Sequence, residues 1–227
     1  MICYKVVDYD YKFLFADVGC QGRISDGGVY RNSFFYKATQ ENFLNLPPKK
    51  PLPASNNPYY NDQNNEPMPY VFLADDAFPL GTHCLKPYSQ AGLTPMKRIF
   101  NYRLSRVRRI TENAFGILTN RFRVFTTKMC LDPEKATTIT LATLVLHNML
   151  RELSSQSYTP EGFVDTETKN GEILLGDWRE ENAEVSVLRT LPSCSSRNVT
   201  KQAQEVRDKF AEHFWGPGQI PWQWKMI

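Results

Sequence analysis

Apolar residues recur at a helical spacing along residues 98–125. They stand three or four positions apart, which is typical of one buried face on an amphipathic helix. These positions are Phe100, Leu104, Val107, Ile110, Ala114, Ile117 and Leu118. Between them stand many arginines and a single acid, Glu112. The pattern predicts a long helix with an apolar face toward the core and a basic face toward solvent.

Three more helices are predicted. The motif at residues 132–134, Asp-Pro-Glu, is typical of a helix start, and the apolar positions after it predict a mostly buried helix; they are Ile139, Ala142, Val145, Leu146, Met149 and Leu153. His147 on this helix is interpreted as a hydrogen-bonded core histidine, because no second His or Cys stands at ligand spacing. A short helix is predicted from about residue 30 to 44, and a last one from about 199 to 215, before a Gly-Pro-Gly stop at residues 216–218.

Strands are predicted in the first third of the chain. Residues 2–7 and 12–18 are rich in Val, Tyr and Phe and are separated by a short polar turn, which predicts a β-hairpin. Residues 69–74 form a short apolar run that ends at Asp75, as a buried strand does. Two stretches show no apolar period and are predicted to be irregular, residues 45–68 and residues 154–196.

The composition narrows the class of protein. The chain has 227 residues and a hydrophobic fraction of 41%, which is sufficient for one domain with a core and a tail. Its five cysteines are scattered and form no C-x-x-C pair, which predicts reduced, buried thiols in a nuclear or cytosolic protein rather than a zinc module. No charged-then-apolar leader opens the sequence, and its longest apolar-rich run is too short for a membrane span.

The basic residues are concentrated in one stretch. The formal charge of +3 is too small to indicate nucleic-acid binding by itself, but residues 97–109 hold several Lys and Arg and no acid, which is typical of a polyanion site. Glu112 follows Arg108 and Arg109 by about one helical turn, so its carboxylate is expected to stay ionised. Two interpretations stay open: a solvated basic helix with a chance ion pair, or a carboxylate kept charged to bind a divalent cation while the arginines face phosphates.

Two aspartates are further candidates for cation binding. Asp26 stands beside two glycines, where a turn residue is the simpler interpretation. Asp75 follows a predicted strand, and ligand sites in α/β sheets gather just beyond the carboxyl ends of strands. For Asp75, cation binding and the capping of a turn or helix agree equally well with the sequence.

Several segments, taken in order, resemble the DDE endonuclease domain of PIF/Harbinger transposases and their domesticated, nuclease-like relatives. No single segment decides the resemblance, but the ordered set is specific and extends over nearly the whole chain. The segments are Phe15–Tyr30, Phe72–Leu80, Phe100–Leu118, Leu146–Asn148 and Val206–Phe210.

The resemblance implies an α/β fold with an RNase H-like mixed sheet flanked by helices, and a nuclease that cuts DNA with a divalent cation, Mg²⁺ or Mn²⁺. It implies that Asp75 and Glu112 are catalytic acids that bind the metal, and that Asp26 is a further metal ligand. Four arginines would hold the DNA backbone, a contact that positions DNA without reading its sequence; they are Arg103, Arg106, Arg108 and Arg109. DNA and a separate Myb-like DNA-binding protein are the implied partners, and the nucleus is the expected location, with the cytoplasm second.

One family feature has no counterpart in this sequence. The family's first catalytic aspartate lies on the first, central strand, which would precede Ile2, whereas Asp8, Asp10 and Asp17 match the hairpin after that strand. The sequence therefore predicts a sheet without its first strand and impaired catalysis, as in an incomplete gene model or a truncated copy. Residues 1–155 are the predicted endonuclease-like domain.

The remaining residues, 156–227, are predicted to be an irregular segment and a C-terminal helix that packs on that domain. The alternative function is a non-catalytic DNA- or protein-binding module of the same fold, which the missing acid favours. A small-molecule hydrolase is disfavoured, because the sequence has no G-x-S-x-G, H-E-x-x-H or phosphate loop.

Overall fold

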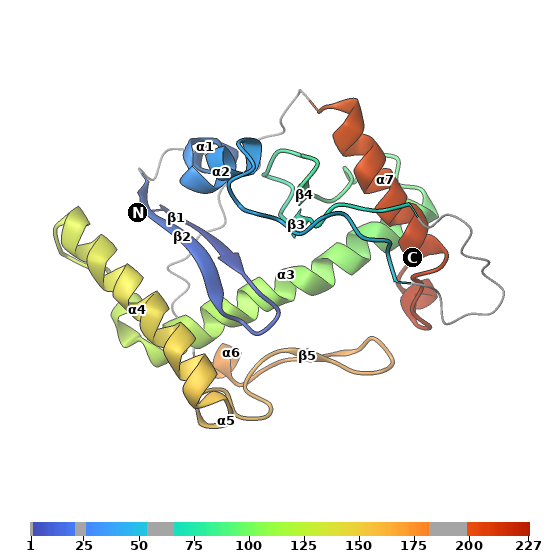
Figure 1. Cartoon of the computed structure of the whole chain (residues 1–227). Coiled ribbons are helices and arrows are strands. Elements are labelled where there is room, and N and C mark those ends of the chain that lie inside the picture. The colour runs from blue at the N-terminus through green and yellow to red at the C-terminus, as the bar shows by residue number, and fades with distance from the viewer. Residues whose placement is uncertain (1, 21–25, 54–65, 182–198) are drawn as a thin grey trace. The chain divides into compact units, whose positions relative to one another are not determined.

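The structure, a computed structural model, describes residues 2–20, 26–53, 66–181 and 199–227 (Figure 1). The chain divides into two compact units. The first unit comprises Met1–Phe34 and Arg109–Leu191, and the second comprises Phe35–Arg108 and Pro192–Ile227. The predicted domain boundary between residues 155 and 156 stays a prediction.

A β-hairpin opens the first unit, as predicted. Strands β1 (Ile2–Val7) and β2 (Phe13–Cys20) are antiparallel, and β2 lies against helix α4 (Pro133–Leu153) (Figure 1). The amide of Asn148 on α4 accepts from Phe13 N at 2.8 Å and donates to Phe13 O at 2.9 Å, which satisfies the strand's backbone as a neighbouring strand would. The apolar core here joins Phe13 and Leu144 to Ala114 and Leu118 of helix α3 (Pro95–Arg121).

Helix α4 confirms the predicted helix but not the predicted buried face. Val145 and Leu153 are 69% and 74% exposed, whereas the buried positions are Ala136, Thr140, Thr143, Leu144, His147 and Arg151. The polar members of this face have partners: Thr140 Oγ1 donates to Ala136 O at 2.8 Å, and the Arg151 guanidinium lies 2.7 Å from Asp10 Oδ1. Polar side chains that satisfy one another therefore replace the apolar stripe in the interior, and the prediction from periodicity was wrong here.

His147 is the hydrogen-bonded core histidine that the sequence predicts. It is fully buried, its Nε2 lies 2.8 Å from Tyr11 O, and its Nδ1 lies 2.9 Å from Tyr158 Oη. Because a carbonyl oxygen only accepts, Nε2 carries the proton and Nδ1 accepts from the Tyr158 hydroxyl. Burial raises the pKa of Tyr158 to about 12, so this hydroxyl keeps its proton.

We expect His147 to make the stability of the chain depend on pH. Burial lowers the pKa of His147, and Arg151 and Lys5 lower it further, while the Tyr11 hydrogen bond opposes the shift. The unfolded chain thus binds a proton below pH about 6.5 that the folded chain does not, and the free energy of unfolding falls as the pH falls below that value. Urea denaturation between about pH 5 and 8 should show this slope in the natural chain and a flatter one in His147→Gln. Equal slopes of unfolding free energy against pH in the two proteins would contradict the assignment of His147 as a histidine that stays neutral in the folded chain.

The segment after α4, predicted to be irregular, contains only short elements where the structure describes it. It contains α5 (Ser155–Tyr158), β5 (Thr166–Glu167), β6 (Ile173–Leu174) and α6 (Trp178–Glu181). Each element has two to four residues, too few to show a hydrophobic period. Their positions depend on side-chain contacts with helix α3 (Pro95–Arg121), which the local sequence does not reveal.

The second unit is built around the first part of α3, and α7 (Lys201–Trp215, red in Figure 1) packs on it. Thr200 caps α7 through a hydrogen bond from Ala203 N to its side chain, and Gly216 follows the helix. The apolar core of this unit consists of Met68, Leu80, Leu85, Tyr88, Phe100, Leu104, Ala203, Phe210 and Ala211. The C-terminal tail packs back through the 3-10 helix η2 (Gln223–Met226), whose Gln223 is buried and donates to Phe214 O at 2.9 Å.

Two further predictions about secondary structure are corrected. The predicted buried strand before Asp75 is the two-residue β3 (Phe72–Leu73), which pairs in parallel with β4 (Cys84–Leu85) and leaves Leu73 40% exposed. The predicted helix from about residue 30 is two helices, α1 (Asp26–Asn32) and α2 (Phe34–Gln40). A short 3-10 helix, η1 (Arg123–Phe125), follows α3.

The described residues are a mixture of helices and three two-stranded sheets. This agrees with the predicted α/β class, whereas the RNase H-like sheet and its missing first strand stay predictions. Of the described cysteines, Cys84 is buried but Cys130 is exposed, so the expectation of uniformly buried thiols was wrong. Within the described ranges, no helix has the length and hydropathy needed to cross a membrane.

Candidate metal and DNA site

Asp75 begins a turn one residue beyond the end of β3, in the second unit. Its Oδ1 accepts from Asp76 N at 2.8 Å, and its carbonyl oxygen accepts from Phe78 N at 3.1 Å, so the turn-capping role is confirmed. Its other carboxylate oxygen, Oδ2, lies 3.6 Å from Arg108 Nη1, and its side chain is 32% exposed. The carboxylate is therefore fixed by the turn and keeps a solvent-facing side.

Glu112 lies on the second part of α3, in the first unit. Its side chain is 42% exposed, and its Oε2 lies 3.7 Å from Nη2 of Arg179. Arg109, one of the two arginines expected to flank it, instead forms an ion pair with Glu167, whose side chain is only 9% exposed. A positive neighbour of Glu112 thus comes from α6, far along the chain.

Arg179 is held by Asp165, whose side chain is fully buried. The guanidinium Nε donates to Asp165 Oδ1 at 2.9 Å and to Oδ2 at 3.0 Å, and Nη2 also donates to Oδ2. Gly176 N donates to Asp165 Oδ1 at 2.9 Å. Burial alone would raise the pKa of Asp165, but these hydrogen bonds outweigh it and lower the pKa below its usual value; the bond to Asp165 in turn raises the pKa of Arg179.

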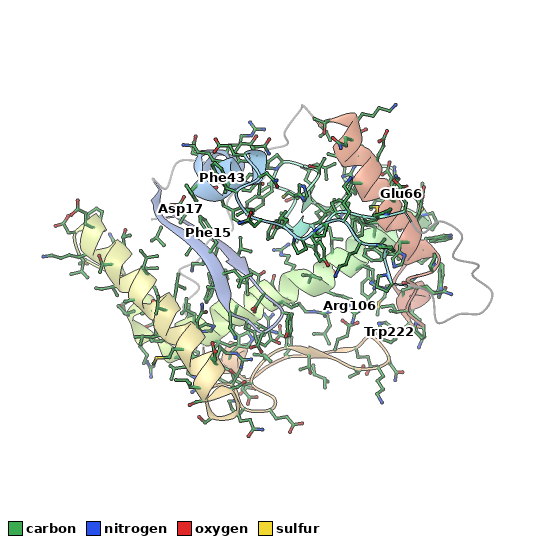
Figure 2. All side chains as sticks on the ribbon, viewed as in Figure 1. Phe15, Asp17, Phe43, Glu66, Arg106 and Trp222 are labelled. Atoms are coloured by element: carbon green, nitrogen blue, oxygen red, sulfur yellow. The ribbon has the colours of Figure 1, made fainter. Side chains whose placement is uncertain are left out.

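The four predicted DNA-binding arginines have different surroundings. Arg108 is the exposed one of the four, at 53% of its side chain, whereas Arg109 is 17% exposed. Arg103 donates to Gly218 O at 3.0 Å and stacks on Phe214. Figure 2 shows Arg106 beside Trp222, and its guanidinium lies 5.5 Å from the ring centre. Their contacts with DNA stay predictions, and Arg108 is the one that solvent reaches best.

Comparison with known proteins identifies the family. The family model described as DDE superfamily endonuclease matches residues 1–148. The chain belongs to this family. The match confirms the resemblance stated from the sequence, and it includes both Asp75 and Glu112 of this DDE endonuclease chain.

A curated relative of the DDE endonuclease chain is Protein ALP1-like of Arabidopsis thaliana, which is 27% identical over 158 residues. The alignment covers 69% of this chain but only 36% of the relative, so this chain spans little more than a third of the relative's length. No solved structure gives a significant match.

The acids of this DDE endonuclease chain suit a hard cation in their chemistry. Mg²⁺ prefers carboxylate oxygens and water, and Asp75 and Glu112 both offer partly exposed carboxylates. Asp26 begins α1, and its side chain lies outside the described part of the chain. Asp75 belongs to the second unit and Glu112 to the first, and the described residues include no group of three His, Cys, Asp or Glu side chains close enough to hold a metal. A shared metal site stays a prediction.

Sequence reasoning missed Arg179, which lies beside Glu112, and Asp165, which binds Arg179, because both lie more than fifty positions further along the chain. It also set aside Asp8, which directly follows β1. Asp8 Oδ1 accepts from Asp10 N and from Lys12 N, each at 2.9 Å, so its carboxylate is fixed in the turn of the antiparallel hairpin. A strand followed by an acid was the available signal.

Proposed function

We propose that this DDE endonuclease chain is the nuclease part of a transposase-derived protein, and that it cleaves phosphodiester bonds in DNA with a divalent cation. The observation that carries the proposal is the family match over residues 1–148, within which both Asp75 and Glu112 lie. The DNA substrate, the metal and the catalysis are parts of the proposal.

In this proposal Asp75 and Glu112 bind the cation through their carboxylate oxygens. Mg²⁺ or Mn²⁺ would stabilise the charge that develops on the phosphate and activate the attacking water. The turn that fixes Asp75 through Asp76 N supports this role, because a ligand held by its surroundings loses little conformational freedom on binding. Asp26 is proposed as a further ligand from its match to the family alone.

The direct test uses supercoiled plasmid DNA and the full chain. Nicking or linearisation that requires Mg²⁺ or Mn²⁺ and stops with EDTA supports the proposal. DNA binding without cleavage in either metal would instead support a non-catalytic binding module, which is the alternative of the same fold.

The source of a third metal-binding carboxylate, beside Asp75 and Glu112, decides whether catalysis by this chain is impaired. The family resemblance assigns it to the family's first, central strand rather than to the hairpin of β1 and β2. Asp8, whose carboxylate is fixed in the hairpin turn, is proposed as a second candidate source. Asp8→Asn keeps an oxygen that can accept the two backbone hydrogen bonds of the turn, so it should remove the charge and preserve the hairpin.

If Asp8 supplies the carboxylate, Asp8→Asn should abolish metal-dependent cleavage, whereas Asp17→Asn on the neighbouring strand β2 should not. If both variants cleave at the rate of the natural chain, Asp8 has no role in cleavage.

Arg108 is proposed to contact a DNA phosphate, because it is the exposed partner of Asp75. Arg108→Gln is expected to weaken binding to DNA of any sequence and to reduce the slope of log K against log salt by about 1, since one phosphate contact releases about one counterion. Fluorescence anisotropy with two unrelated duplexes over a salt series measures both quantities. Arg123→Gln, an exposed arginine on η1, is the comparison; an unchanged slope in Arg108→Gln would exclude the contact.

The proposal also includes location in the nucleus and a Myb-like DNA-binding partner. Both come from the family resemblance, and both are tested in cells by imaging a tagged chain and by identifying the proteins that co-purify with it. A tagged chain outside the nucleus, with no DNA-binding protein attached, would contradict this part.

A further inference from the structure

A segment beyond the family match is attached to α3 next to Glu112. Asn113, the neighbour of Glu112, donates to Asp165 O at 3.0 Å and accepts from Asp165 N at 3.0 Å, so its amide pairs with the backbone of this segment as a strand would. Trp178 Nε1 donates to the same Asn113 oxygen at 3.0 Å. All of these groups belong to the first unit.

Gly116 allows the close approach of this segment. A Cβ atom at position 116 would lie 2.3 Å from the Trp178 ring, which is far inside van der Waals contact. Only glycine lets the indole lie against this turn of α3. Asn113 and Gly116 therefore form a docking site for residues 163–181, and Glu112 stands at its edge.

The docked segment places the guanidinium of Arg179 beside the Glu112 carboxylate. Nη2 of Arg179 donates to Asp165 Oδ2 and also lies 3.7 Å from Glu112 Oε2, so the same nitrogen faces both carboxylates. The Nε bonds to Asp165 and the stacking on Trp178, with the guanidinium 4.5 Å from the ring centre, fix its orientation.

We propose that Arg179, oriented by Asp165 and Trp178, is a positioning residue for Glu112. This inference rests on the proposed function, because it assumes that Glu112 binds the cation. Arg179 touches neither metal nor DNA in this account. It orients the Glu112 carboxylate so that the carboxylate oxygens can bind the cation. Asp165 and Arg179 lie outside the 148 residues that the family model matches, so the family match does not assign them this role.

The geometry requires arginine at this position. A planar guanidinium offers several donors in a fixed arrangement and can face two carboxylates at once, whereas a lysine ammonium is a single flexible point charge. Residues that orient metal ligands typically change metal affinity or activity by about 10–100-fold when they are replaced. The pair itself is partly exposed, so its effect is on the position of Glu112 rather than on stability.

The test measures Mn²⁺ binding to the full chain by the loss of the free-ion electron paramagnetic resonance signal, together with thermal denaturation. The variants are Arg179→Lys and Arg179→Gln, with Lys169→Gln as the control, because it removes one exposed positive charge from the same segment. We expect the Kd for Mn²⁺ to rise about 10–100-fold in both Arg179 variants and to change less than about twofold in the control. Where cleavage is measurable, kcat should fall by a similar factor with little change in the KM for DNA.

The Arg179→Lys variant decides the outcome if Arg179→Gln fails to fold, because lysine keeps a charge opposite Asp165. A folded Arg179→Lys chain with the natural Kd overturns the positioning role. Glu112→Gln separates this failure from that of the proposed function: if Glu112→Gln weakens Mn²⁺ binding but Arg179→Lys does not, only the inference about Arg179 fails. If Glu112→Gln leaves Mn²⁺ binding unchanged, or the natural chain binds no Mn²⁺, the proposed site and this inference are both overturned.

Discussion

Glu112→Gln is expected to abolish Mg²⁺-dependent DNA cleavage while DNA binding persists. Glutamine has the same shape but no charge, so it removes a hard, anionic metal ligand from α3 without changing the helix. A bound metal stabilises the transition state by several kcal/mol, and about 4 kcal/mol corresponds to about a thousandfold in rate. We therefore expect kcat to fall by about 10³-fold or more, measured by single-turnover cleavage of a labelled duplex, and the Kd for DNA to change less than about threefold.

The control for this prediction is Glu134→Gln, which neutralises an exposed acid in the first turn of α4. It should cleave at the natural rate. If the background activity of the chain is low, the same comparison is made with a longer protein that contains it. Cleavage by Glu112→Gln at the natural rate would remove Glu112 from the mechanism.

Asp165→Ala is expected to have the largest effect on stability. Asp165 is fully buried and accepts from Arg179 and from Gly176 N, so its removal leaves these donors without their acceptor. Breaking a buried ion pair typically costs about 3–5 kcal/mol, and we expect about 3 kcal/mol here because Arg179 keeps some contact with water. Urea denaturation measures the loss, and Asp177→Ala, an exposed acid in the same segment, should change the free energy of unfolding by less than about 0.5 kcal/mol.

The pH dependence of Asp165 gives a second check. Its lowered pKa means that the carboxylate binds a proton less readily in the folded chain than in the unfolded chain. Its contribution to stability is therefore present above the ordinary aspartate pKa of about 4 and is lost as the pH falls through the lowered value. An Asp165→Ala chain as stable as the natural chain would show that the ion pair does not hold this segment. The same conclusion would follow if Asp165→Ala and Asp177→Ala lost equal amounts of unfolding free energy.

The long elements could be predicted from the sequence, because many residues repeat one pattern. Helix α3 agrees with its apolar stripe at Phe100, Leu104 and Ala114, and the hairpin agrees with its two runs of β-forming residues. The buried face of α4 could not be predicted, because His147 and Arg151 are buried by specific partners rather than by their hydrophobicity. Periodicity reports apolar surface, and it does not report polar groups that satisfy one another.

In the candidate site, too, some residues could be predicted from the sequence and others could not. Asp75 and Glu112 could be named from strand position, charge pattern and family resemblance. Arg179 could not, because its link to Glu112 passes through Asp165 and through Asn113, which are separated by 52 positions. Contacts of that kind form only in the folded chain. Elements of two to four residues are too short to have a sequence pattern that predicts them.

The central claim is that Asp75 and Glu112 bind one divalent cation. Crystals of the chain grown or soaked with Mn²⁺ test it directly through the anomalous scattering of manganese. We predict one strong peak within coordination distance of both carboxylates. A Mn²⁺ ion coordinated by only one of them, or bound elsewhere while both carboxylates face solvent or their arginines, would contradict the account.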